Sequence, residues 1–250
     1  MTEKDIPQHQ LLQLADTCLL WGHRLSEWCG HGPALEEDIA LTNTALDVIG
    51  QARTLYQIVS QRKNEFGVKD VNGVTEDTLA FFREPDEFQN VRLAELPNGD
   101  YAHTIVRSFF LAAWFAPVWE QLADSGADPD VCALAREAHK AARAQWRHAS
   151  EWVVRFGDGT IESKTRVEAA INELLPYAHE LLSLHLDHVD MKSTEQRWQQ
   201  MIAEALTRAT LPPLTAPLPT PRMDQLHRRH RVELLSEMQS LARQHPNAVW

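Results

Sequence analysis

The residues of this chain that could do chemistry are its 35 acidic residues and 12 histidines, within 250 residues. Helical di-iron proteins hold their metal with a Glu from each of two helices and a Glu-x-x-His from each of two others. No histidine here follows a Glu by three positions. Only Asp100–His103 and Asp224–His227 have this spacing with Asp, and both lie where a helix is expected to begin, a place where Asp serves as a cap. The sequence therefore predicts no metal site in this chain.

Two histidine pairs, His185-x-x-His188 and His227-x-x-His230, could bind a metal ion on one helix face. Neither pair has a carboxylate or a cysteine partner in the sequence, so an exposed polar face is the favoured interpretation. The chain has no Gly-rich phosphate loop, no Gly-x-Ser-x-Gly and no signature of a cysteine nucleophile. We therefore predict no catalytic and no cofactor-binding residue.

A basic cluster lies between Arg222 and Arg231. It could meet an acidic partner or a phosphorylated ligand. A charge run of this kind is more often a solvated helix face. The sequence leaves both readings open for this cluster, which contains Arg222, Arg228, Arg229 and Arg231.

Composition excludes several classes of partner. The formal net charge of −11 argues against nucleic acid, since binding to phosphates needs a basic surface. The longest apolar run, 109–119, is well short of the ~20 residues that span a bilayer. The first ten residues show no secretory signal, and the three cysteines form no Cys-x-x-Cys. We expect a protein of the reducing cytoplasm that binds neither membrane nor nucleic acid.

The elements that must position these residues are helices. The central one is expected from about 34 to 60, and it carries two apolar stripes, which predict contact with neighbours on two sides. The first stripe contains Leu41, Ala45, Val48, Ala52, Leu55 and Val59, and the second contains Leu35, Ile39, Leu46, Ile49 and Tyr56.

Other long helices are expected at 8–29, 98–125, 129–156, 162–187, 193–209 and 223–245. The stretch 63–98 has no sustained period and reads as an irregular connection with one short helix at 76–82. A proline-rich linker at about 211–221 precedes the last helix. Nothing alternates as strands do. The prediction is an all-α helical bundle of about six to seven long helices in a single domain, 1–250.

Five stretches carry a resemblance to a known family. They are RLSEWCGHGPALEEDIALTNTALDVIGQAR at 24–53, EDTLAFFR at 76–83, LPNGDYAHTIVR at 96–107, WVVRFGDGT at 152–160, and LLSEMQ with the terminal Trp250. The chain resembles the PaaC family, the non-catalytic ferritin-like structural subunit of the bacterial ring-1,2-phenylacetyl-CoA epoxidase. The stretches occur in family order and cover nearly the whole chain.

The resemblance implies a ferritin-like bundle that pairs with a homologous catalytic subunit carrying the di-iron centre. With a small bridging subunit and a reductase, that complex epoxidises the ring of phenylacetyl-CoA using O₂ and NADPH in aerobic phenylacetate breakdown. The reductase would hold flavin and an iron–sulfur cluster, and this chain would hold no cofactor. Self-association of this chain is a further interaction to test.

The same resemblance indicates degenerate ligand positions. Where the catalytic relative carries Glu-x-x-His, this chain has Val48 and Gln51 in one helix and Ala142 and Gln145 in another. It also departs from the family pattern near Ala141 and Gln145, and at 227–232, where it reads His-Arg-Arg-His-Arg-Val.

Two other functions stay open at this point. One is a free-standing ferritin-like metalloprotein or oxidase with an unusual site, and the other is a helical binding module. Iron content would distinguish a metalloprotein from a structural subunit. Co-purification with a catalytic partner would distinguish a structural subunit from a helical binding module.

Overall fold

The structure is a computed structural model that describes residues 5–65, 73–214, 225–246 and 248. Within these residues the chain forms nine α-helices and one short 3₁₀ helix, with no strand, so the predicted all-α class is confirmed. None of the helices described is long and apolar enough to cross a membrane. In chain order the elements are α1 Gln8–Ser26, α2 Leu35–Glu65, α3 Glu76–Phe81, η1 Pro85–Glu87, α4 Arg92–Glu95, α5 Tyr101–Asp124, α6 Pro129–Gly157, α7 Ile161–Leu182, α8 Met191–Arg208 and α9 Gln225–Gln244.

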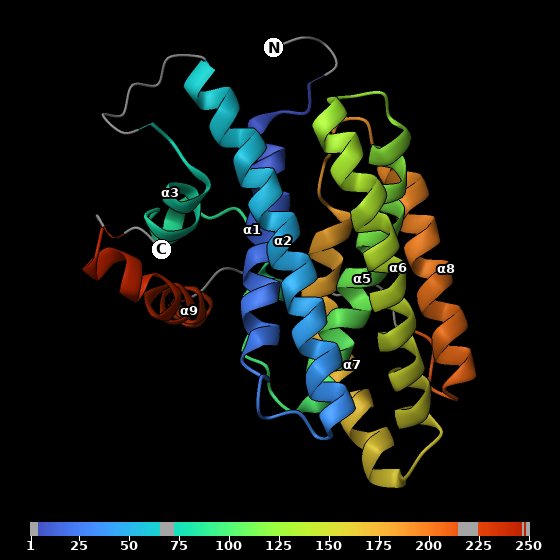
Figure 1. Ribbon diagram of the computed structural model, residues 1–250. Coiled ribbons are helices and arrows are strands. Elements are labelled where there is room, and N and C mark those ends of the chain that lie inside the picture. The colour runs from blue at the N-terminus through green and yellow to red at the C-terminus, as the bar shows by residue number, and fades with distance from the viewer. Residues whose placement is uncertain (1–4, 66–72, 215–224, 247, 249–250) are drawn as a thin grey trace. The chain divides into compact units, whose positions relative to one another are not determined.

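The chain divides into two compact units. Unit 1 contains Met1–Ile6 and Asn98–Arg222, and unit 2 contains Pro7–Pro97 and Met223–Trp250. Each unit is built on a pair of long helices, α5 with α6 in unit 1 and α1 with α2 in unit 2 (Figure 1). Such pairs are the building elements of a ferritin-like bundle. A single domain over 1–250 stays a prediction, and most of the proline-rich linker, 215–221, lies outside the described residues.

In unit 2, α1 and α2 are joined by a short loop and pack against each other as a helical hairpin. All six residues of the first stripe of α2 are buried. The helices approach closely at Gly22 of α1, where an added Cβ would lie 2.5 Å from Cγ1 of Ile49 and 3.0 Å from Cγ2 of Val48. Glycine is needed at this crossing because any larger residue would push the pair apart.

The second stripe of α2 behaves differently. Tyr56 is buried and Ile49 is half-buried, but Leu35, Ile39 and Leu46 are 74%, 51% and 65% exposed. Within unit 2, these three side chains therefore do not make the predicted contact with a second neighbour. Their exposure leaves an apolar face on α2 that the other described elements of unit 2 do not cover.

Residues 76–95 of unit 2 are more regular than predicted. The expected helix at 76–82 is α3, which Thr75 caps by accepting a hydrogen bond from the Thr78 amide at 3.2 Å. Two further short helices, η1 and α4, follow it. The sequence analysis did not predict these two helices, because three or four residues are too few to show a helical period.

Helix α9 packs on this segment through polar side chains. Gln239 donates to the carbonyl oxygens of Ala80 and Arg83 at 3.2 and 3.1 Å. Arg231 is buried and donates to Oε2 of Glu95 at 2.6 Å and to the Phe88 carbonyl at 3.2 Å. These bonds join the last helix to residues that lie up to 159 positions earlier in the chain.

A buried carboxylate, Asp16 of α1, organises the middle of unit 2. It accepts hydrogen bonds from the Tyr56 hydroxyl at 2.5 Å, from the Gln89 amide at 2.8 Å and from both terminal nitrogens of Arg83. Burial, reinforced by the Asp16 charge, raises the pKa of Tyr56 well above its ordinary value, so the phenol remains a donor. The guanidinium of Arg83 also lies 4.1 Å from the centre of the Phe88 ring.

In unit 1, α5 is the most deeply buried element. Its aromatic residues include Phe109, Phe110 and Trp114, and Trp198 of α8 donates its indole N–H to the Phe110 carbonyl at 3.1 Å. Asp100 caps α5 as predicted, by accepting from the His103 amide at 3.0 Å. Two helices of this unit contain an interior proline and continue past it, α5 at Pro117 and α7 at Pro176.

One boundary in unit 1 differs from the prediction. Helix α7 ends at Leu182, five positions before the expected end at Asp187. The chain then turns through His188, whose φ of 64° lies in the left-handed region, and Asp190 caps the next helix. The apolar spacing continues past Leu182, but the backbone there no longer follows a helix.

We expect Arg83→Met to destabilise unit 2 strongly. The substitution keeps most of the side-chain volume but leaves the buried Asp16 carboxylate without its cation, and breaking one partner of a buried ion pair costs about 3–5 kcal/mol. Urea unfolding measures the change in the free energy of unfolding.

The matched control is Arg53→Met. Arg53 lies 3.5 Å from Glu76 with its side chain 69% exposed, so its loss should cost less than about 1 kcal/mol. Equal effects of the two substitutions would contradict the central role of Asp16.

Candidate functional site

The four degenerate ligand positions of the sequence are the ligand-like positions of this chain, and two of them, Val48 and Gln51, lie on the side of α2 that faces α1. Val48 is fully buried beside Gly22, and Gln51 is buried one turn further along. The thiol of Cys18 in α1 donates to Oε1 of Gln51 at 3.8 Å. Burial raises the pKa of the Cys18 thiol, so that it stays protonated. This turn of the hairpin therefore offers an alkyl group, an amide and a neutral thiol.

The corresponding positions of α6 lie inside unit 1. Ala142 and Gln145 are both buried. The Nε2 atom of Gln145 makes no hydrogen bond to any described residue. A buried amide donor without a partner costs free energy, so the local structure is not optimised around this group.

These four positions do not fit a di-iron centre. Val48 and Ala142 have no donor atom, and the amides of Gln51 and Gln145 are weak ligands beside the carboxylates and imidazoles that such a centre uses. In the described parts of the chain, no three His, Cys, Asp or Glu side chains are grouped so that they could hold a metal ion.

The Asp100–His103 pair is a cap and a link between helices. Nδ1 of His103 lies 2.8 Å from Oδ1 of Asp100, and its Nε2 lies 2.9 Å from Oε2 of Glu173 in α7. Burial alone would lower the pKa of His103, but its bonds to the two carboxylates raise it above the ordinary value. The second pair, Asp224–His227, lies outside the residues whose side chains the structure describes.

The paired histidines do not share a helix face at 185–188. Because α7 ends at Leu182, His185 and His188 lie in the following turn, so the one-face interpretation of this pair is wrong. His185 is exposed and lies 3.2 Å from Asp187. Of the other pair, His230 is half-buried in α9.

The basic cluster at 222–231 is not one surface. Arg231 is buried against Glu95, and Arg229 pairs with Glu233 at 2.6 Å. Arg228 is exposed, and Arg222 lies outside the described residues. An acidic partner or phosphorylated ligand therefore cannot reach the cluster as a whole, since Arg231 serves to attach α9.

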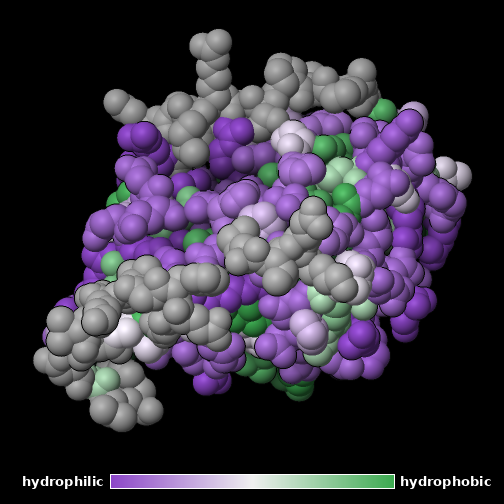
Figure 2. All heavy atoms as spheres, turned by 90° about the horizontal axis from the view of Figure 1, so that it is seen from above, coloured by the Kyte–Doolittle hydropathy of each residue, from purple (hydrophilic) through white to green (hydrophobic). Residues whose placement is uncertain are grey.

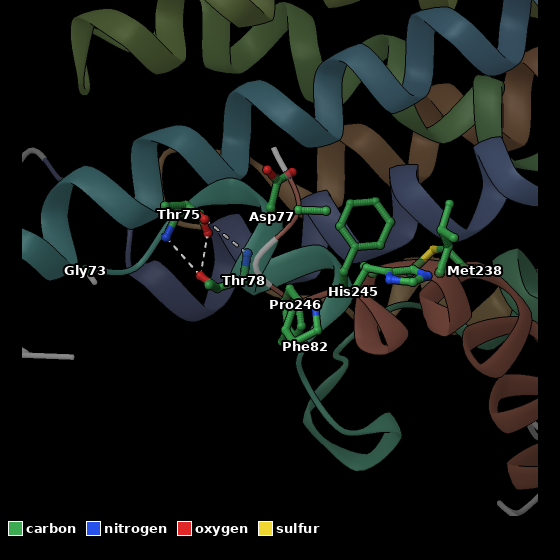
Figure 3. A pocket seen from close by; sticks show the side chains of 12 residues that line it. Gly73, Thr75, Asp77, Thr78, Phe82, Met238, His245 and Pro246 are labelled. Atoms are coloured by element: carbon green, nitrogen blue, oxygen red, sulfur yellow. Dashed lines mark hydrogen bonds between the residues drawn. The ribbon is translucent and has the colours of Figure 1, made fainter. Parts of the chain in front are cut away.

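An apolar groove lies between α3 and α9 in unit 2 (Figure 3). Its volume is about 580 Å³, and Phe82, Met238 and His245 are among the side chains that line it. The Thr75–Thr78 capping bonds lie at one side of it, as the dashed lines show. The described residues that line the groove include no group of catalytic side chains. We therefore interpret it as a gap left where α9 packs against α3.

A second groove, also of about 580 Å³, lies in unit 1 between α6 and α8, with α5 at its floor. Its lining contains four arginines and only two glutamates, which gives it a net charge of +2. Sequence reasoning missed it. The i, i+4 spacing of Arg143 and Arg147 is visible in the sequence. The sequence does not show that α8 brings further arginines to the same groove.

The exposed part of α2 is the third candidate surface. Leu35, Ile39 and Leu46 lie on one side of the helix, and a Cβ added at Gly50 beyond them would meet no atom within 4 Å. On the face drawn in Figure 2, hydrophilic residues predominate and hydrophobic ones show in small groups. Exposed aliphatic residues at helical spacing indicate a surface for another helix.

Comparison with known proteins agrees with the family resemblance. The family model described as "Phenylacetic acid catabolic protein" matches residues 2–250. A relative from Escherichia coli (strain K12), one of the subunits of its 1,2-phenylacetyl-CoA epoxidase, is 36% identical over 251 residues, which cover 96% of this chain and 97% of that protein. The chain therefore belongs to the phenylacetic acid catabolic protein family.

Proposed function

We propose that this chain is the non-catalytic structural subunit of an epoxidase complex that acts on the ring of phenylacetyl-CoA. The observation that carries the proposal is the combination of whole-length similarity to an epoxidase subunit with ligand-like positions that lack donor atoms, Val48 and Ala142. Its partner would be a homologous subunit that holds the di-iron centre, with a small bridging subunit and a reductase.

The reaction sets what those partners must supply. One atom of O₂ enters the ring as the epoxide and the other leaves as water, so the reaction consumes two electrons and two protons, which NADPH and a solvent proton provide. We propose that no cofactor for these steps is bound by this chain. The flavin and iron–sulfur groups would belong to the reductase.

The exposed face of α2 would be the contact with the di-iron subunit. Fully burying a Leu or Ile side chain stabilises a complex by about 1.5–3 kcal/mol, so three such residues can contribute substantially. The open position at Gly50 would let a partner helix approach closely. Self-association through the same face is the competing arrangement.

The complex would work in the cytoplasm. The three cysteines of the sequence are all free, with Cys18 and Cys132 buried and Cys29 exposed. Unpaired cysteines support a reducing compartment.

We predict that the isolated chain binds no stoichiometric iron. Val48 and Ala142 cannot donate to a metal, and amide groups at Gln51 and Gln145 replace imidazole. Anaerobic loading with ferrous iron, desalting and elemental analysis measure the content. One or two tightly held irons per chain would overturn the structural-subunit proposal.

Val48→Glu should destabilise the protein more at pH 8 than at acid pH. A carboxyl buried against α1 has its folded-state pKa raised, so the folded state retains a proton that the unfolded state releases, and stability falls as pH rises above the unfolded pKa. The loss at pH 8 should be about 2–4 kcal/mol by urea unfolding.

The matched control is Leu46→Glu on the exposed face of the same helix, which should show no such pH dependence. If Val48→Glu were as stable as the parent at pH 8, the assignment of the buried face of α2 would be incorrect.

Epoxidation should require this chain and the exposed face of α2. Mixing the di-iron subunit, bridging subunit and reductase with this chain should give NADPH- and O₂-dependent turnover of phenylacetyl-CoA, whereas this chain alone should give none. Ile39→Glu with Leu46→Glu should weaken association about ten-fold or more, because two apolar contacts are replaced by charges.

Association is measured by calorimetry or analytical ultracentrifugation. Ile161→Glu is the control, because Ile161 is 89% exposed at the start of α7 and lies outside the proposed contact. Full activity of the other components without this chain would refute the proposal, and unchanged association of the double variant would refute the assigned face.

A further inference from the structure

The groove between α6 and α8 contains more positive charge than the protein neutralises. Two of its arginines are paired, Arg197 with Glu120 and Arg208 with Glu151. In the part of the chain that the structure describes, Arg143 and Arg147 make no ion pair and no hydrogen bond through their side chains, and both are exposed.

This arrangement has an energetic cost that an anion would remove. Arg143 and Arg147 are four residues apart on α6, so they are neighbours on the helix surface, and like charges at this spacing destabilise a helix. The whole chain has a formal net charge of −11, so this groove is a local reversal of sign. A groove with a net positive charge concentrates anionic ligands.

The size and the lining of the groove indicate the kind of anion. About 580 Å³ is within the range of small-molecule sites and exceeds what a single phosphate fills. Guanidinium groups bind phosphate oxygens in pairs of parallel hydrogen bonds.

An aromatic ring lies beside these cations. Trp146 lines the groove between Arg143 and Arg147 in sequence and is half-buried. The Phe109 ring stacks on the indole at a centroid distance of 4.9 Å and an interplanar angle of 24°, which fixes the indole plane. A fixed, partly accessible aromatic ring next to phosphate-binding groups suits a purine base.

We propose that this groove binds the nucleotide part of a ligand, with its di- or triphosphate on Arg143 and Arg147 and its base against Trp146. The source would be either a free nucleotide or coenzyme A, which contains an adenosine diphosphate group. Only the coenzyme A alternative rests on the proposed function.

The test is calorimetric titration of the full chain at low salt with ADP, with coenzyme A and with pyrophosphate. ADP and coenzyme A should bind at one site per chain. Arg143→Gln with Arg147→Gln should weaken both about ten-fold or more, since each guanidinium makes charge-assisted hydrogen bonds.

The control is a second double variant of equal charge, Arg136→Gln with Lys192→Gln. These exposed residues lie on α6 and α8 but do not line the groove. Their replacement should leave affinity nearly unchanged. Thermal melts of both double variants show that neither has unfolded.

Trp146→Leu separates a nucleotide site from a bare anion site. It should weaken ADP and coenzyme A but leave pyrophosphate binding as it is. Tighter binding of coenzyme A than of ADP, with both weakened by Trp146→Leu, would support the site and assign coenzyme A as the source of the nucleotide. Equal binding of pyrophosphate and ADP, with no effect of Trp146→Leu, would overturn the proposal.

Two further outcomes would overturn it. One is the absence of binding, or binding that the Arg143/Arg147 double variant does not change. The other is loss of association with the epoxidase subunits in that variant without any nucleotide binding, which would assign the groove to an acidic protein surface. Failure of the parent chain to assemble concerns the proposed function alone, because the titration uses the isolated chain.

Discussion

The fold of unit 2 depends on neutralising two fully buried carboxylates, Asp16 and Glu95. A buried charge without a partner is costly, so each needs a cation brought from elsewhere in the chain. Arg83 reaches Asp16, and Arg231 reaches Glu95. Because Arg231 lies on α9, the last helix must return to the first part of the chain, and the short helices at 76–95 must hold a fixed path to present Arg83. The ion pairs thus specify a connection that apolar packing alone would leave undefined.

This use of buried charge contrasts with the ligand-like positions. In a di-iron protein, buried carboxylates are balanced by metal. Here arginine balances the buried carboxylates of unit 2, while Val48 and Ala142 pack as apolar residues. The result is a pair of long helices at Gly22 and Val48 that can be tightly packed without a metal to hold it together. A tightly packed helix pair without a metal could serve as a support if its outer faces bind other subunits. The exposed apolar face on α2 is consistent with such a role.

The sequence predicted the features that local spacing determines. The buried stripe of α2 follows from a period of 3.6, and the cap at Asp100 follows from its side chain and position. Prediction from the sequence failed where a distant contact determines the burial of a residue, or where a backbone turn determines the end of a helix. Nothing local shows that Arg231 is buried, because its partner lies 136 residues away. The end of α7 was missed because apolar spacing continues beyond Leu182, and α4 was missed because four residues show no period. The ligand-like positions were identified by family resemblance, and the α6–α8 groove could not be seen until the two helices were placed together.

The surfaces of the two units differ in the interactions they can make. Unit 2 exposes aliphatic residues on α2, and an apolar face gains most from binding a complementary protein surface, since the gain scales with the area removed from water. Unit 1 exposes guanidinium groups on α6, whose binding energy comes from hydrogen bonds and charge and therefore depends on salt. The same ionic strength that weakens binding in the groove would leave the apolar contact nearly unchanged or strengthen it. Salt dependence therefore separates the two surfaces without any substitution, because each kind of contact responds to a different property of the solvent.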